Sequence, residues 1–154
     1  MPAFTVTPIG HIETPWATTA ECPRNGRQLD PPPLCRVVVA AEYRAGLAGL
    51  DSFSHLILLF WMLQGGPTEL VLTPRFASAP RGVFGTRAPI HPNPISLSVV
   101  RFEGFAEPGV LLVRNLDCVS GTPLVDIKPY LPSTDAEPGA SMGWLAPHAT
   151  PRQD

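Results

Sequence analysis

Cysteine is scarce in this sequence, and the few cysteines are widely separated. Cys22, Cys35 and Cys118 are an odd number and form no Cys-x-x-Cys pair. This spacing argues against a disulfide framework and against a tetrahedral zinc site. The four histidines are scattered too, with no pair at metal-ligand spacing. The sequence therefore predicts reduced thiols and no bound metal ion.

Long apolar runs and an excess of positive charge are also missing. The longest apolar run, residues 56–63, is far shorter than the roughly 20 residues that span a bilayer. No basic segment followed by an apolar stretch opens the chain. The formal net charge is −2, whereas proteins that bind nucleic acid through its phosphates alone are typically basic. We expect a soluble, cytoplasmic protein with no membrane partner, in which any RNA contact is local.

Proline, by contrast, is abundant. The 154 residues include 20 prolines, which have no Gly-X-Y period, so a collagen-like chain is excluded. Because an internal proline removes a backbone donor and clashes with the preceding turn, long helices should be rare. The apolar fraction of 44% and the charged fraction of 16% nevertheless predict a folded chain with one core.

Short apolar or alternating stretches dominate the pattern and predict seven or eight strands. The opening strand is expected to contain Phe4, Val6, Ile9 and Ile12, and residues 41–50 are the best candidate for a short helix. Strands do not alternate with helices, so a small, mostly antiparallel β-barrel with long proline-rich loops is favoured over a Rossmann fold. The other expected strands are residues 37–41, 55–63, 69–73, 95–99, 110–113 and 124–127.

Two long connections and a tail complete the expected organisation. Residues 14–34 and 74–94 are predicted to be loops, because prolines and glycines interrupt any periodicity. Residues 1–132 should form the barrel domain and residues 133–154 a proline-rich C-terminal tail. The apolar tail residues Met142, Trp144 and Leu145 fit either a homodimer contact or packing on the chain's own barrel.

No standard catalytic or nucleotide-binding motif is present, but residues 82–97 concentrate polar groups. This segment contains Arg87, His91 and Asn93 between prolines, which would hold them with little conformational freedom, as suits ligand capture. The alternative is a barrel corner in which Arg87 forms only a surface salt bridge.

A second polar segment, residues 121–130, contains Asp126, Lys128 and Tyr130. Asp126 and Lys128 are two residues apart and so lie on the same side of a strand, where they can orient each other. The alternative is an ordinary ion pair on an edge strand. His55, which opens a predicted strand, is expected to be structural.

Five ordered blocks give the sequence a resemblance to a known family. They are PIGHIETPW, the tripeptide Pro-Arg-Asn at positions 23–25, LAGLDSFSHLILLFW, GVFGTRAPIHPNPISLSVV and DCVSGTPLVDIKPYLP. From about residue 4 to residue 132 the chain resembles the TrmO/YaeB family, also called TsaA-like or VirR-like. The resemblance implies a small β-barrel that binds S-adenosyl-L-methionine and works as a homodimer. It also implies methylation of N6 of threonylcarbamoyladenosine beside the tRNA anticodon.

The same resemblance implies a set of site residues. Asp126, Lys128 and Tyr130 are predicted at the mouth between cofactor and substrate, with Asp126 orienting the acceptor or taking its proton. His91 and Asn93 are predicted to bind the substrate. The predicted cofactor-binding residues are Pro23, Arg24, Asn25, Leu63, Gln64, Arg87, Leu97, Val119, Ser120, Gly121 and Thr122.

Some positions depart from the family pattern. His91 stands where many relatives have arginine, and Ser120 stands where many have an acidic residue. Longer tRNA-methylating relatives also have an additional C-terminal domain. The leading interpretation is an S-adenosylmethionine-dependent methyltransferase. The alternatives are an S-adenosylmethionine-binding or sensing module without turnover, and a β-barrel interaction protein with no small ligand.

Overall fold

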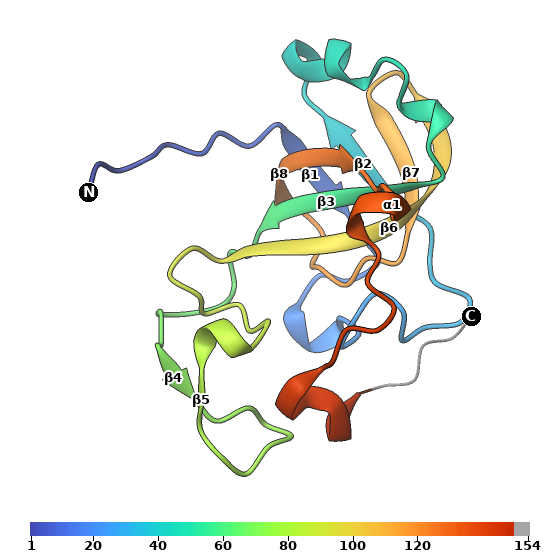
Figure 1. Ribbon diagram of the computed structural model, residues 1–154. Helices are drawn as coiled ribbons and strands as arrows, with labels where there is room; N and C mark the ends of the chain where they lie inside the picture. Colours follow the sequence, from blue (N-terminus) through green and yellow to red (C-terminus); the bar gives the residue numbers. More distant parts are fainter. Residues whose placement is uncertain (150–154) are drawn as a thin grey trace.

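Six strands close into an antiparallel barrel in the computed structural model, which describes residues 1–149 (Figure 1). In order around the barrel the strands are β1 (Gly10–Glu13), β2 (Cys35–Val39), β7 (Val110–Arg114), β6 (Ile95–Glu107), β3 (His55–Trp61) and β8 (Thr122–Pro129). The last of these pairs again with the first. The fold class expected from the sequence is thereby confirmed.

The barrel interior is filled by alternate residues of its strands, since successive side chains of a strand point to opposite faces. In β3, Leu56, Leu58 and Phe60 are at most 1% exposed. Every barrel strand contributes buried side chains to the same cluster. Burying a side chain of this size contributes about 1.5 to 3 kcal/mol to folding. The closed barrel is therefore a rigid support for the loops at its ends.

The alternating segment at the start of β6 turns its apolar side outward. Ser98 lies opposite Leu58, which is fully buried, so the alternation directs Ser98 inward and Leu97 outward. Ile95 and Leu97 are accordingly 44% and 45% exposed. Further along the same strand, Val100 enters the core. The outer surface of the barrel thus has an apolar stripe on β6.

The opening strand is shorter than the sequence predicts. Of the predicted strand only its end forms, as β1, and Phe4 and Val6 are 82% and 46% exposed. β2 ends at Val39, so this neighbour does not extend far enough to pair with residues 4–6. The prediction that Phe4 and Val6 belong to a strand is therefore wrong.

The short helix predicted at residues 41–50 is a pair of 3-10 turns, η2 (Ala41–Leu47) and η3 (Leu50–Ser52). They are separated at Gly49, whose φ of 81° favours glycine. The remaining elements are η1 (Thr19–Glu21), β4 (Val71–Leu72), β5 (Arg81–Gly82), η4 (Val83–Gly85), α1 (Pro132–Asp135) and η5 (Gly143–His148). No helix within residues 1–149 is long and apolar enough to cross a membrane.

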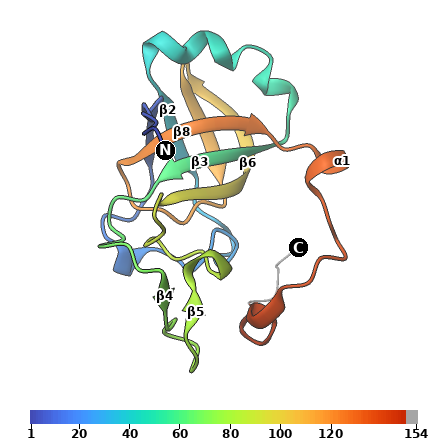
Figure 2. The same ribbon diagram turned by 60° about the vertical axis from the view of Figure 1, so that its left-hand side comes forward.

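Three segments that are distant in the sequence gather at one end of the barrel, opposite η2 and η3 (Figures 1 and 2). They are the loop of residues 14–34, the connection of residues 62–94 and the segment that carries η5. Trp144 joins the last two: its Nε1 donates to the carbonyl oxygen of Gly85 at 2.9 Å, and its ring stacks on Phe76. This tail residue therefore packs on its own chain, and a homodimer contact of the tail stays a prediction.

Candidate functional site

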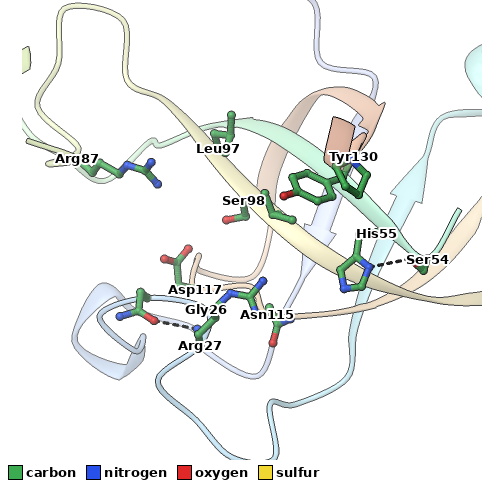
Figure 3. A pocket seen from close by; sticks show the side chains of 13 residues that line it. Gly26, Arg27, Ser54, His55, Arg87, Leu97, Ser98, Asn115, Asp117 and Tyr130 are labelled. Carbon is green, nitrogen blue, oxygen red and sulfur yellow. Dashed lines mark hydrogen bonds between the residues drawn. The ribbon is translucent and has the colours of Figure 1, made fainter. Parts of the chain in front are cut away.

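An open cavity of about 630 Å³ lies where the loop of residues 14–34 faces β6 and the connection between β7 and β8 (Figure 3). Four of the predicted site residues line it, namely Asn25, Arg87, Leu97 and Tyr130. The other residues of its wall are Gly26, Arg27, Ser54, His55, Ser98, Val99, Asn115, Asp117 and Pro132. Cavities of this volume are typical of small-molecule sites.

The loop of residues 14–34 is held against the barrel by a close backbone contact. A Cβ at Gly26 would fall on the carbonyl oxygen of Asn115. Asn115 has a φ of 75°, the left-handed conformation that asparagine tolerates better than most residues. Next to the contact, Oδ1 of Asn25 accepts a hydrogen bond from the backbone nitrogen of Arg27 at 2.9 Å. These contacts fix the Pro-Arg-Asn tripeptide at the edge of the cavity.

Asp117 and Arg87 supply opposite charges to the cavity, and their side chains point toward it from different walls (Figure 3). Burial raises the pKa of the Asp117 carboxyl above its usual range, and the charge of Arg87 offsets part of this increase. A carboxylate in such a place can accept a proton or an N–H hydrogen bond. Asp117 is absent from the sequence predictions, although its position directly after buried Leu116 marks it as a polar residue at the edge of the core.

His55 also lines the cavity, whereas the sequence suggests only a structural role. Its Nδ1 lies 2.8 Å from Oγ of Ser54, and its ring meets Tyr130 edge-on with 6.4 Å between centroids. The two rings come from the start of β3 and from just beyond β8. They form an aromatic wall of the cavity, and Tyr130 is the one predicted mouth residue that reaches it.

A smaller cavity of about 160 Å³ adjoins the first, and Arg87 and Leu97 line both. His91 lies in its wall, where its Nε2 contacts the carbonyl oxygen of Thr86 at 3.0 Å. The proline-rich segment 82–97 therefore brings Arg87 and His91 to adjoining cavities. Asn93 lines neither of them.

The turn of residues 119–122 lies outside both cavities and its polar groups bond within the protein. Oγ1 of Thr122, which is 4% exposed, donates to the carbonyl oxygen of Val119 at 2.6 Å. The backbone nitrogens of Ser120 and Gly121 each donate at 2.7 Å, to Trp16 and to Ile12 respectively. These bonds fix the turn, and its predicted contact with a cofactor stays a prediction.

Asp126 and Lys128 form the ion pair that their spacing predicts, with 2.8 Å between Oδ2 and Nζ. The hydrogen bond and the charge of Asp126 raise the pKa of Lys128. Neither residue lines a described cavity, and their register partners Leu59 and Ile57 lie on the same face of the barrel. Their catalytic role stays a prediction.

The remaining predicted cofactor residues lie outside the walls of the two cavities. The guanidinium of Arg24 lies over the ring of Phe76, 5.2 Å from its centroid. The side chain of Leu63 is 68% exposed, beyond the end of β3. Pro23 precedes Arg24 in the chain, and Gln64 follows Leu63. The predicted cofactor contacts of these four residues stay predictions.

The three cysteines of residues 1–149 are unpaired thiols, and the two buried ones have raised pKa values. Burial raises the pKa of the Cys35 thiol to about 11 and that of Cys118 to about 12, so both stay protonated at neutral pH. No group of three or more histidine, cysteine or acidic side chains in this range is placed to hold a metal ion.

Comparison with known proteins decides the family. The sequence model of the tRNA-methyltransferase O N-terminal domain matches residues 11–136, most of the chain. The chain belongs to this TrmO family. The resemblance seen in the five sequence blocks is thereby confirmed. A crystal structure of TrmO is 37% identical and superimposes with a TM-score of 0.77, covering 92% of this chain and 64% of that one.

Three relatives show the range of the TrmO family. The probable S-adenosyl-L-methionine-binding protein VirR of Rhizobium radiobacter is 37% identical over 121 residues, which are 79% of this chain and 67% of VirR. An S-adenosyl-L-methionine-binding protein of Archaeoglobus fulgidus is 38% identical over 128 residues, or 83% and 90% of the two chains. The tRNA (adenine(37)-N6)-methyltransferase of Escherichia coli is 34% identical over 152 residues; the match spans 94% of this chain but only 65% of the enzyme.

Proposed function

We propose that this chain binds S-adenosyl-L-methionine and transfers its methyl group to N6 of adenine 37 in tRNA, with the threonylcarbamoyl form of the base as acceptor. The observation that carries the proposal is the cavity in which Asp117, Arg87 and Tyr130 meet. The family supports it too, because the Escherichia coli relative is named for methylation of adenine 37. The VirR relative is named for binding the cofactor.

The cavity walls suit the cofactor's chemistry. Arg87 can bind its carboxylate, and Asn25 offers an amide to a polar edge. Leu97 and Val99 offer apolar surface, and the rings of His55 and Tyr130 offer faces or edges to an adenine. When bound, S-adenosyl-L-methionine supplies a methyl group that is already activated toward a nitrogen nucleophile.

The residues of the chain then have to align the acceptor amine, take up its proton and exclude water. The Asp117 carboxylate lies in the cavity wall and can accept the N6 proton, and its raised pKa brings it closer to the working pH of a general base. Arg87 lies on the same cavity and limits that increase. Tyr130 and Leu97 also line the cavity.

Calorimetric titration with S-adenosyl-L-methionine and S-adenosylhomocysteine, followed by methyl transfer to tRNA that carries threonylcarbamoyladenosine, tests the proposal. We expect micromolar or tighter binding of both compounds and transfer of one methyl group to the modified base. Cofactor binding without transfer to any tRNA would favour the sensing module. Absence of binding would overturn the proposed function.

The proposal includes a homodimer. The apolar outer side of β6, with Ile95 and Leu97 nearly half exposed, borders the cavity and offers a surface that a second copy can cover. Leu97 would then close the cavity from the side that is open in the single chain. We expect sedimentation at micromolar concentration to give twice the mass of the chain; the mass of one chain would contradict the dimer.

A further inference from the structure

The arginines of the barrel and those of the neighbouring loops differ in their partners. Each of the barrel arginines Arg36, Arg101 and Arg114 has a carboxylate within 4.0 Å. Within residues 1–149, Arg75 and Arg81 form no ion pair with a carboxylate. Residues 74–94, which we call the arginine loop, contain three arginines and no acidic residue. Positive charge is therefore concentrated in this loop, in a chain whose net charge is −2.

Aromatic rings hold two guanidinium groups in place outside the cavity walls. Arg81 lies over the ring of Trp144 at 4.8 Å, and Arg24 lies over Phe76 at 5.2 Å. The two rings stack on each other, 6.1 Å apart and within 11° of parallel. A guanidinium that rests on a ring uses its face for that contact, and its N–H groups, which lie in its plane, stay available for an acceptor. Nε of Arg81 is buried without a hydrogen-bond partner, so a phosphate would have to be bound by the other N–H groups of this guanidinium.

The arginine loop also leads into the cavity. Arg87 belongs to the same loop and lines both cavities. Asn25, the neighbour of Arg24, lines the larger one. A ligand strand that follows Arg75 and Arg81 can therefore continue into the cavity, where the reacting base would lie. A nucleic acid has this form, with regularly spaced phosphates attached to bases.

We propose that the arginine loop, together with Arg24, binds the phosphates of an RNA strand whose target base enters the cavity. This inference rests on the proposed function, and it assigns the RNA contact to Arg75 and Arg81, outside the cavity walls. Arginine suits this partner because its planar fork of N–H groups matches the oxygens of a phosphate. An acidic protein surface would be the other anionic partner, but it would not explain why the loop leads into a small-molecule cavity.

The test compares two double variants that remove the same charge. R75Q/R81Q changes the arginine loop, and R36Q/R101Q changes barrel arginines that are paired with carboxylates. The probe is a fluorescent tRNA anticodon stem-loop, and its anisotropy is followed from 50 to 300 mM salt with saturating S-adenosylhomocysteine. We expect R75Q/R81Q to weaken RNA binding about tenfold or more and to reduce the slope against log salt by about 1 per arginine. The control should stay within about twofold of the parent.

Arg81 packs on Trp144, so its replacement could also loosen the loop. Arg75→Gln alone avoids this problem, because Arg75 is exposed and touches no ring within the described residues. It should weaken RNA binding by about threefold and leave the affinity for S-adenosylhomocysteine unchanged. Equal losses in the two double variants, or a parent chain that binds no RNA, would overturn the inference. The proposed function is judged separately, by cofactor binding and methyl transfer in the parent chain.

Discussion

Replacing Asp117 with asparagine should lower the rate of methyl transfer by about 10² to 10⁴-fold, the usual contribution of a general base. Asparagine keeps the size of the side chain but cannot take up a proton at neutral pH. The cavity itself should persist, so the affinity for S-adenosylhomocysteine should change much less than the rate. Single-turnover methylation of modified tRNA and calorimetry on the same variant measure the two quantities.

The same substitution should not destabilise the fold. Burial raises the pKa of Asp117 in the folded chain, so the folded state binds more protons than the unfolded state between the two pKa values. Stability therefore falls as the pH rises through that window, and ionised Asp117 opposes folding at neutral pH. Asp117→Asn removes this effect, so its urea midpoint at pH 7 should equal or exceed that of the parent. A loss of activity with unchanged stability separates a catalytic role from a structural one.

Two comparisons complete this experiment. Asp51→Asn, an exposed change in η3 at the other end of the barrel, should leave both rate and stability unchanged. Asp126→Asn tests the residue that the sequence favours as the base. If Asp126→Asn abolishes transfer while Asp117→Asn retains the parent rate, the base is Asp126 and the assignment of Asp117 is wrong.

The barrel could be predicted because short stretches of the sequence are enough to indicate its strands. Apolar runs such as Leu56, Leu58 and Phe60 alternate into the core, and prolines limit helices, so strands were the consistent choice. Which side of β6 faces the core is harder to predict. Its alternation of Leu97 with Ser98 indicates a strand but not which side faces the core, and the register with β3 directs the serines inward. Register depends on the partner strand, which one sequence segment does not specify.

Each predicted site residue that lines the cavity lies in one of the five blocks that resemble the family. Arg87, Asn25 and Tyr130 lie in such segments, and the fold brings them to one cavity. Asp117 is not among the predicted residues, because its place after buried Leu116 indicates the edge of the core but no function; only the folded connection between β7 and β8 brings it to the cavity. Asp126 looked more functional because it has a charged neighbour, yet the structure pairs it with Lys128 away from the described cavities.

Replacing Gly26 with alanine should cost the chain at least about tenfold in affinity for S-adenosylhomocysteine. The new Cβ would fall on the carbonyl oxygen of Asn115, and that atom is backbone, which cannot rotate away as a flexible side chain could. The loop of residues 14–34 must then move outward. Asn25 and Arg27, its contributions to the cavity wall, would move with it.

The effect should be confined to the site, because Gly26 belongs to no barrel strand and the core cluster contains no residue of this loop. We therefore expect the thermal midpoint of Gly26→Ala to fall by only a few degrees. Gly46→Ala is the matched control: a Cβ there meets no atom within 4 Å, so binding and stability should both stay at the parent values. Full cofactor affinity in Gly26→Ala would mean that the loop does not form the cavity wall in solution. Lost affinity with an intact barrel would show instead that the contact between Gly26 and Asn115 is what positions the Pro-Arg-Asn segment for binding.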